Sequence, residues 1–215
     1  MWKNQKKTII FTTLVTLLPI VAGIIFWDQL PEQLAIHFNA AGEPDNFAPK
    51  AAALLGLPAA LAAIHLLCLF MTDKDPKKQN MSAASKMLVL WVCPFISWLG
   101  MSITIGYALE AVRNITSIVS VCLGILFMVI GNYLPKCPPS YTVGIKLPWT
   151  LHSDDNWRYT HRIGGFCFMA AGLITLIGGI FGFVWTAAPA LILAAIVPTV
   201  ASYLYYKKHG EDAQK

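Results

Sequence analysis

Fixed charge is scarce in this chain of 215 residues. Lys, Arg, Asp and Glu make up 13% of it, whereas a soluble protein has about 25%. Together with 56% hydrophobic residues, this shortage argues against a soluble or a disordered chain. The net charge of +5 is small and scattered along the sequence, which argues against direct nucleic-acid binding. The composition therefore predicts an integral membrane protein.

The chain also lacks the short motifs of common enzymes. It has no H-E-x-x-H metalloprotease spacing, no Walker motif and no nucleophile elbow, so no catalytic residue is predicted. Its five cysteines lie in or beside apolar runs or in a segment that we place in the cytoplasm, so no disulfide is expected. We predict a protein without enzymatic activity, cofactor or metal.

Apolar runs long enough to cross a bilayer occur six times. A hydrocarbon core about 30 Å thick needs about 20 helical residues. The sequence therefore predicts an all-α, polytopic helical bundle that forms one membrane domain over residues 1–215. The predicted spans cover residues 8–27, 51–71, 87–109, 115–134, 164–184 and 187–206.

Basic residues gather on one side of these spans. With the N-terminus inside, fourteen of the 16 Lys and Arg residues lie on the inner side, and only Lys50 and Arg113 lie on the outer side. Basic residues near span ends stay in the cytoplasm, so both termini are predicted to be cytoplasmic. This orientation leaves two sizeable connections, an outer loop at residues 28–50 and an inner loop at residues 135–163.

The outer loop combines a strand-like alternation with a turn. The even-numbered residues of 34–39 are apolar and are predicted to share one face, which turns toward the membrane. Gly, Pro and Asp at 42–45 predict a turn, and hence a short strand or hairpin. Four acidic residues and one lysine give this loop a net charge of −3, which favours a cationic partner. One alternative is a solvated acidic loop without a partner. A metal site on His37, Glu43 and Asp45 is a second, less favoured alternative. The candidate partner-binding residues are His37, Asn39, Gly42, Glu43 and Asp45.

The inner loop holds a dense group of polar and aromatic residues. Its prolines predict an extended first half, and Ser153 is a good N-cap for a helix from about residue 154. The alternatives are an interfacial helix with an aromatic belt, a functional unit, and an acid–base or metal site on His152, Asp154, Asp155 and His161. The candidate functional residues are Asn132, Pro135, Gly144, Lys146, Pro148, Trp149, Thr150, Trp157, Thr160, His161 and Arg162. Four of these are expected to pack as one unit against the ends of the fourth and fifth spans, namely Trp149, Trp157, His161 and Arg162.

Two features inside the spans also need an explanation. His65 is the only ionisable residue well inside a span, where it has either a satisfied structural role or a proton or ligand role. Gly178 and Gly182 have the small-xxx-small spacing, which predicts the close approach of another helix.

Both loops resemble those of the SdpI family, bacterial immunity proteins against a secreted killing peptide. In the outer loop the similarity lies in residues 30–31, 36–39, 42–45 and 50, and in the inner region it lies in residues 131–136, 144–151, 157–158, 160–162 and 164–165. The resemblance covers the chain from Asp28 to about Gly179. Lys146 stands where the family pattern has arginine, so no bidentate guanidinium contact is expected there.

This resemblance implies an immunity or receptor protein in the bacterial cell membrane. Its partners would be a secreted peptide toxin at the outer loop and a cytoplasmic repressor protein captured at the inner face. Membrane lipid is a further expected partner, because the inner loop carries aromatic and basic residues typical of the headgroup region. The alternative is a small transporter or membrane enzyme, which would need a polar path from His65 and Asn132 to both sides.

The predicted orientation is tested by labelling. Single cysteines introduced at residues 45 and 154 of a cysteine-free variant should react with a membrane-impermeant thiol reagent from opposite sides of the membrane, because the basic residues place these positions on opposite sides. Labelling of both positions from the same side would show the topology to be wrong.

Overall fold

A computed structural model describes residues 2 and 5–209 of the chain. It has six helices that are long and apolar enough to cross a membrane, so the predicted number of spans and the helical fold class are confirmed. The spans are Lys6–Ile25, Lys50–Lys74, Ala83–Ala108, Ile115–Lys136, Asp154–Phe181 and Val184–His209.

The chain forms two compact units, so the predicted single domain stays a prediction. The first unit comprises Met1–Asp73 and Met87–Thr116, and the second comprises Lys74–Lys86 and Ser117–Lys215. Within each unit, segments that are predicted to be on the same side of the membrane lie together. The hairpin lies beside residues 107–113 in the first unit, and Asp75 contacts residues 140–142 in the second.

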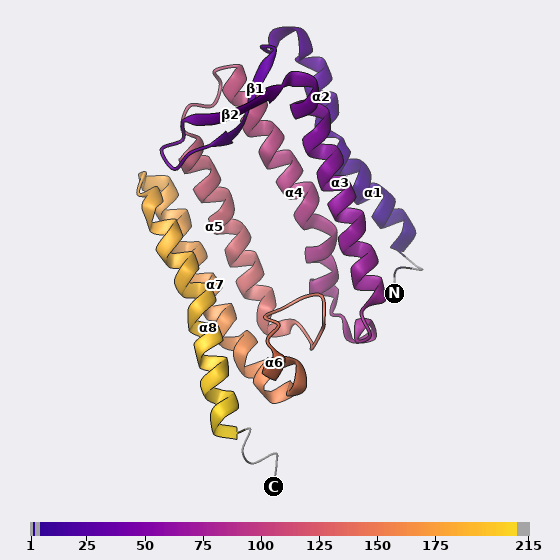
Figure 1. Ribbon diagram of the computed structural model, residues 1–215, viewed down its shortest axis with the longest axis vertical. Helices are drawn as coiled ribbons and strands as arrows, with labels where there is room; N and C mark the ends of the chain where they lie inside the picture. Colours follow the sequence, from indigo (N-terminus) through magenta and orange to yellow (C-terminus); the bar gives the residue numbers. More distant parts are fainter. Residues whose placement is uncertain (1, 3–4, 210–215) are drawn as a thin grey trace. The chain divides into compact units, whose positions relative to one another are not determined.

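The first unit contains three spans and a hairpin. Pro19 opens a second helix and so divides the first span, because proline has no N–H to continue the helix that precedes it. Figure 1 shows the hairpin at the end of α3 and α4 that lies away from the start of α1. The elements are α1 (Lys6–Leu17), α2 (Pro19–Ile25), η2 (Trp27–Gln29), β1 (Gln33–Phe38), β2 (Pro44–Pro49), α3 (Lys50–Lys74) and α4 (Ala83–Ala108).

The two strands confirm the expected hairpin but not its simple alternation. They pair antiparallel, with Leu34 opposite Ala48, and the register shifts on both sides of His37. As a result Leu34 and Ala35 are both buried, while Ile36 is 48% exposed. The prediction that alternate apolar residues share one face is therefore wrong here, because an irregular register breaks the two-residue period.

Polar side chains fill part of the interior of the first unit, as expected in a membrane. Thr12, Thr16, His65 and Ser97 are fully buried, whereas Ile24 and many other large apolar side chains of the spans are exposed. The Ser97 hydroxyl donates to the carbonyl of Thr16 at 2.7 Å, and similar bonds to backbone carbonyls satisfy the threonines. In lipid such groups must find protein partners, so they hold the helices together from within.

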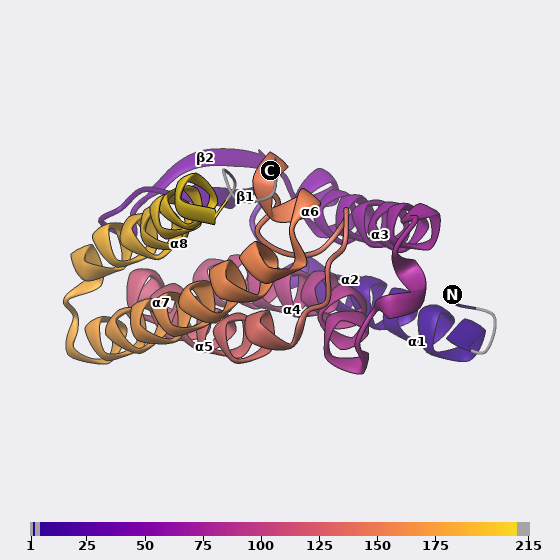
Figure 2. The ribbon, with the colours of Figure 1, turned by 90° about the horizontal axis from the view of Figure 1, so that it is seen from below.

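The second unit is built around a long helical pair. Figures 1 and 2 show α7 and α8 side by side, connected by a tight turn that begins at Gly182 with a φ of +80°. The predicted extended chain of the inner loop contains one short helix, α6, because Pro148 takes the first helical position, where it is tolerated. The elements are η3 (Lys78–Asn80), α5 (Ile115–Tyr133, from Ser117 on), η4 (Leu134–Lys136), α6 (Pro148–His152), α7 (Asp154–Phe181), η5 (Val184–Thr186) and α8 (Ala187–His209).

Glycines spaced by seven residues bring α5 and α7 into backbone contact. A Cβ on Gly131 would lie 2.6 Å from the amide nitrogen of Met169, and one on Gly172 would lie 2.7 Å from the carbonyl oxygen of Gly124. Gly165 and Gly179 continue this row along α7. Small residues thus allow the close packing that the sequence analysis expected at Gly178 and Gly182, but Gly178 faces the turn at Phe183 and Thr186, and Gly182 ends the helix.

The glycine row predicts a contrast between two alanine substitutions. Gly172→Ala should destabilise the protein by about 1–3 kcal/mol, because the new methyl group overlaps backbone atoms that cannot move aside. Gly56→Ala, whose Cβ would have no neighbour within 4 Å, should be neutral or should stabilise α3 by up to about 1 kcal/mol. Thermal unfolding in detergent measures both, and equal midpoints for the two variants would contradict the close packing.

Candidate functional site

The inner loop is held by one buried carboxylate, that of Asp75. Its Oδ2 atom accepts hydrogen bonds from the Ser140 hydroxyl at 2.7 Å, from the Tyr141 and Thr142 amides at 2.9 and 3.0 Å, and from the Thr142 hydroxyl at 2.8 Å. Its Oδ1 atom accepts from the Lys77 amide at 2.8 Å. The side chain thus ties the connection before α4 to the start of the inner loop. Both segments are predicted to be cytoplasmic, and they lie together.

These hydrogen bonds keep Asp75 ionised. Burial alone would raise the pKa of its carboxyl group, but the hydrogen bonds from Ser140, Lys77, Thr142 and Tyr141 outweigh burial and leave the pKa below its ordinary value. A carboxylate that accepts several N–H and O–H groups is stabilised in its charged form. Sequence analysis missed Asp75, because a single acid in a short connection carries no motif.

A second cluster fixes the middle of the inner loop, around Trp157 and His161. The two rings stack at 4.0 Å between centroids, and the Trp157 indole donates to the carbonyl of Cys137 at 2.8 Å. The Nε2 atom of His161 accepts from the Ile145 amide at 3.0 Å, and Nδ1 lies 2.8 Å from the carbonyl of Trp157. His161 is therefore the neutral tautomer with its proton on Nδ1, since a carbonyl needs a donor.

Gly144 allows this cluster to close. Its φ is +122°, and a Cβ there would lie 2.5 Å from Nε2 of His161 and 2.8 Å from the Trp157 ring. Only glycine fits both the conformation and the space. Thr150 holds the next turn, where its hydroxyl accepts from the Leu147 amide at 2.9 Å. Pro148 opens α6, and Lys146 is exposed with its amine 3.3 Å from the carbonyl of Thr142.

Trp149 joins a different cluster from Trp157 and His161. Its indole donates to the Ser202 hydroxyl of α8 at 2.8 Å, and its ring contacts those of Tyr203 and Tyr206. The Asn156 amide bridges α7 and α8, because it accepts from Ser202 and from Thr160 at 2.9 Å. The structure thus places Trp149 against the sixth span, whereas the sequence analysis expected it at the fourth and fifth.

Arg162 is also outside the Trp157–His161 cluster. It lines a pocket of about 600 Å³ at the ends of α5 and α7, together with Asn132, Pro135, Lys136 and Arg158. The four residues expected to form one unit therefore lie in three surroundings. Arg158 pairs with Asp155 at 2.5 Å, and His152 lies 2.6 Å from the carbonyl of Pro148.

The candidate residues of the outer loop bind one another at the tip of the hairpin. His37 Nδ1 lies 2.5 Å from Asp45 Oδ1, and Asn39 Oδ1 accepts from the amides of Ala41 and Glu43 at 2.9 and 3.0 Å. Gly42, with a φ of +83°, makes the turn. Asn39 and Gly42 therefore shape the turn, while the side chains of His37 and Asp45 remain 66% and 43% exposed.

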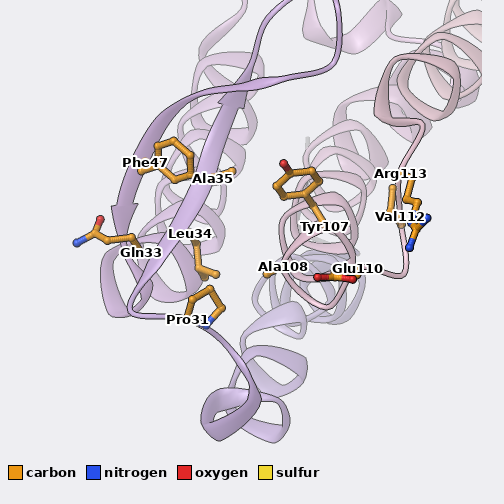
Figure 3. Close-up of a pocket in the computed structure, with 10 residues that line it drawn as sticks. All are labelled: Pro31, Gln33, Leu34, Ala35, Phe47, Tyr107, Ala108, Glu110, Val112 and Arg113. Atoms are coloured by element: carbon orange, nitrogen blue, oxygen red, sulfur yellow. The ribbon is translucent and has the colours of Figure 1, made fainter.

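A pocket of about 410 Å³ lies beside the hairpin, within the first unit. Figure 3 shows Pro31, Leu34 and Phe47 on the hairpin side of this pocket, facing Tyr107 and Glu110 at the end of α4. Its lining also includes Gln33, Ala35, Ala108, Val112 and Arg113. The lining thus combines apolar side chains with one acid, one base and the Gln33 amide. Sequence analysis missed the α4 side, because the connection at residues 110–114 is short.

Glu110 has an unusual backbone conformation for its type. Its φ is +57°, and it is the only residue other than glycine with a positive φ among those that the structure describes. At this helix end the amides of Ala111 and Val112 both donate to the carbonyl of Gly106, an arrangement in which glycine is the usual residue. A side chain there costs about 1–2 kcal/mol, so glutamate is a costly choice for the turn itself.

His65 is fully buried among the helices of the first unit. Its Nε2 atom lies 3.1 Å from the Thr12 hydroxyl, and its Nδ1 atom has no hydrogen-bond partner among the described residues. No group of three or more His, Cys, Asp or Glu side chains in the described part of the chain is placed to hold a metal ion. The loose grouping of His37, Glu43 and Asp45 therefore brings together only one histidine and one carboxylate.

The hydrogen bonds of Asp75 predict an ordered loop that depends on its charge. Asp75→Asn removes acceptor capacity, and the amides of residues 140–143 should exchange with solvent at least about tenfold faster, since bonds to a charged group contribute about 1.5–3 kcal/mol. Because the folded pKa is lowered, the stabilisation is present above the ordinary aspartate pKa and is lost as the pH falls through the lower folded value. Wild-type protection should therefore persist from neutral to mildly acidic pH.

Asp155→Asn is the matched control for this measurement. It removes an equally charged side chain that is 71% exposed and pairs only with Arg158 across one helical turn. Such surface pairs contribute at most about 1 kcal/mol. Hydrogen exchange followed by mass spectrometry should show residues 140–143 unchanged in this variant, and acceleration in both variants alike would refute the role of Asp75.

Comparison with known proteins finds similarity to two family models and to one curated protein. Residues 136–202 match the SdpI/YfhL protein family, and residues 14–62 match a domain of unknown function (DUF1648). The chain is 26% identical over 210 residues to the Immunity protein SdpI of Bacillus subtilis (strain 168). The aligned region covers 95% of this chain and 98% of that protein. No solved structure matches. The resemblance to the SdpI family found in the two loops is confirmed, and with its six membrane-length helices the chain is a multi-pass membrane protein similar to that family.

Proposed function

We propose that this protein is a membrane immunity protein that protects the cell from a secreted peptide toxin, which it recognises at the outer hairpin and the pocket beside it. The relative that spans nearly the whole chain is named an immunity protein. The observation that carries the site is the pocket between the hairpin and the end of α4, with Glu110 at its rim. Its size of about 410 Å³ lies in the range of ligand pockets, about 300–1,000 Å³.

The chemistry of this pocket suits a peptide with apolar and basic side chains. Leu34, Phe47 and Tyr107 offer the apolar contact that peptide side chains need. The outer loop has a net charge of −3, and Lys50 within it is already paired with Glu32 at 2.9 Å. Negative charge at the entrance attracts a cationic peptide and speeds its approach.

Glu110 strengthens the proposal because the helix end needs the positive φ but not the carboxylate side chain. Glycine would make the same turn at lower cost. Strained positions persist where a side chain has a function and the surrounding structure holds it. A carboxylate in this place is suited to bind a Lys or Arg side chain, or the amino terminus, of the toxin.

The inner loop supports a second role, the capture of a cytoplasmic repressor protein that the family resemblance implies. Tyr141 is 48% exposed although its amide is bound to Asp75. An exposed aromatic side chain on an ordered loop is a common anchor in protein interfaces. This surface is separate from the toxin site, so its loss is expected to leave protection intact.

The alternative of an acid–base enzyme is less favoured by the same contacts. Both ring nitrogens of His161 are engaged by backbone groups, so neither is free to exchange a proton with a substrate in this conformation. His152 likewise has Nδ1 on the carbonyl of Pro148. We therefore propose a non-enzymatic function, in which binding at the outer side is the primary event.

Glu110 provides the sharpest test of the proposed function. Expressed in a host that is sensitive to the secreted peptide encoded nearest the gene, the wild-type chain should protect against killing. Glu110→Gly should lose most of that protection and yet unfold at a higher temperature, because glycine relieves the backbone at φ +57°. A killing assay and thermal unfolding in detergent measure the two effects separately.

Two further variants complete this test. Exchange of His37 and Asp45 for Ala should also reduce protection, because both side chains are exposed beside the turn. Tyr141→Ala on the inner loop is the control and should protect like the wild type. Full protection by Glu110→Gly together with the His37 and Asp45 variant would rule out recognition at the outer side.

A further inference from the structure

We infer that the pocket at the ends of α5 and α7 binds the phosphate of an anionic phospholipid, with the acyl chain of that lipid along α7. The pocket lies at the predicted cytoplasmic end of these helices and has a volume of about 600 Å³. This inference does not depend on the proposed recognition of a toxin, because it concerns a different surface and a different ligand.

The side chains that line this pocket give it a positive charge, which nearby carboxylates neutralise only in part. Lys136, Arg158 and Arg162 line it, and no acidic residue does. Arg158 is paired with Asp155, but Arg162 has no carboxylate partner among the described residues. Among the residues that the structure describes, Lys136 contacts neutral groups, since its amine lies 3.4 Å from the Asn132 amide oxygen and 5.5 Å from the centre of the Tyr133 ring.

These groups match a phosphate in geometry as well as in charge. A guanidinium presents parallel N–H donors that bind two phosphate oxygens, while a lysine amine adds a point charge. The Asn132 side chain is exposed at the same rim and offers an amide donor. Basic pockets between spans on the cytoplasmic side are typical sites for anionic headgroups.

Two apolar residues in the lining of the pocket, Phe166 and Met169, favour a lipid as the ligand. Phe166 and Met169 follow Arg162 on the same face of α7, by four and seven residues. Phe166 is 69% exposed and Met169 is 36% exposed, and both belong to a membrane span. An anion held at Arg162 would therefore have an apolar strip beside it that continues into the hydrocarbon core, where an acyl chain lies.

Two glycines of the row in α5 and α7, Gly131 and Gly165, also line the pocket. Gly131 and Gly165 let the two backbones approach so closely that a Cβ on either residue would lie within 3 Å of atoms of the other segment. Because these glycines have no side chains, the lining of the pocket is dominated by longer residues such as Lys136 and Arg162. The pocket thus lies beside the close packing that holds α5 to α7.

The experiment compares lipids on the purified full-length chain in detergent. Phosphatidylglycerol and phosphatidylcholine are added in parallel, and retained lipid is counted by native mass spectrometry. The wild type should retain phosphatidylglycerol at least about tenfold better, because both lipids carry the phosphate but the choline cation of phosphatidylcholine neutralises the headgroup and is repelled by the basic side chains. Equal retention of the two lipids overturns the inference, and this comparison needs no variant.

Charge variants then locate the site. Arg162→Gln with Lys136→Gln should reduce the retention of phosphatidylglycerol to that of phosphatidylcholine. Lys207→Gln with Lys208→Gln removes the same charge from exposed positions near the end of α8 and should leave retention unchanged. Equal losses in both pairs would show a general attraction to basic residues and would overturn the assignment of the pocket.

Inorganic phosphate distinguishes a lipid from a soluble ligand. Because the acyl chain contributes to binding, inorganic phosphate at the same concentration as phosphatidylglycerol should not displace it. Displacement at equal concentration would show that the pocket binds free phosphate and would overturn the lipid assignment.

Discussion

The inner loop depends on one interaction, the acceptance of five hydrogen bonds by the buried carboxylate of Asp75. Prolines prevent the start of this loop from forming a helix or sheet, so its amides have no partners of their own. Buried amides without acceptors cost about 1–3 kcal/mol each. A carboxylate has enough lone pairs to satisfy several of them at once, which neutral side chains do not.

Beyond the residues that Asp75 binds, a second set of hydrogen bonds holds the inner loop against the start of α7. The Ile145 amide binds His161 and the Trp157 indole binds the carbonyl of Cys137. Gly144 lies between the residues that Asp75 binds and these bonds and has no side chain to separate them. The density of His, Trp and Thr in this region is therefore a means of ordering irregular backbone.

The two proposed binding surfaces follow from different physical constraints. Beside the hairpin, a helix end that takes glutamate in place of glycine presents a carboxylate at the rim of an apolar pocket. The other pocket lies beside the glycine contact of α5 and α7 and is lined by three basic side chains. The outer surface suits a basic, partly apolar peptide because the outer loop has a net negative charge. The inner pocket suits an anionic lipid because basic and apolar side chains line it together.

Local patterns in the sequence were enough to determine the six spans, the hairpin, the N-cap at Ser153 and the family resemblance, because each depends on residues that are near one another in the chain. The tertiary structure alone decided which distant residues meet. Asp75 binds residues about 65 positions away, Trp149 packs on α8 instead of the nearer spans, and Arg162 turns from the His161 cluster to a basic pocket. A shift in register buried Ala35 and exposed Ile36 against the alternating pattern. Such contacts depend on how helices and strands pack, and a single polar residue in a short connection carries no periodic signal that would reveal its partner.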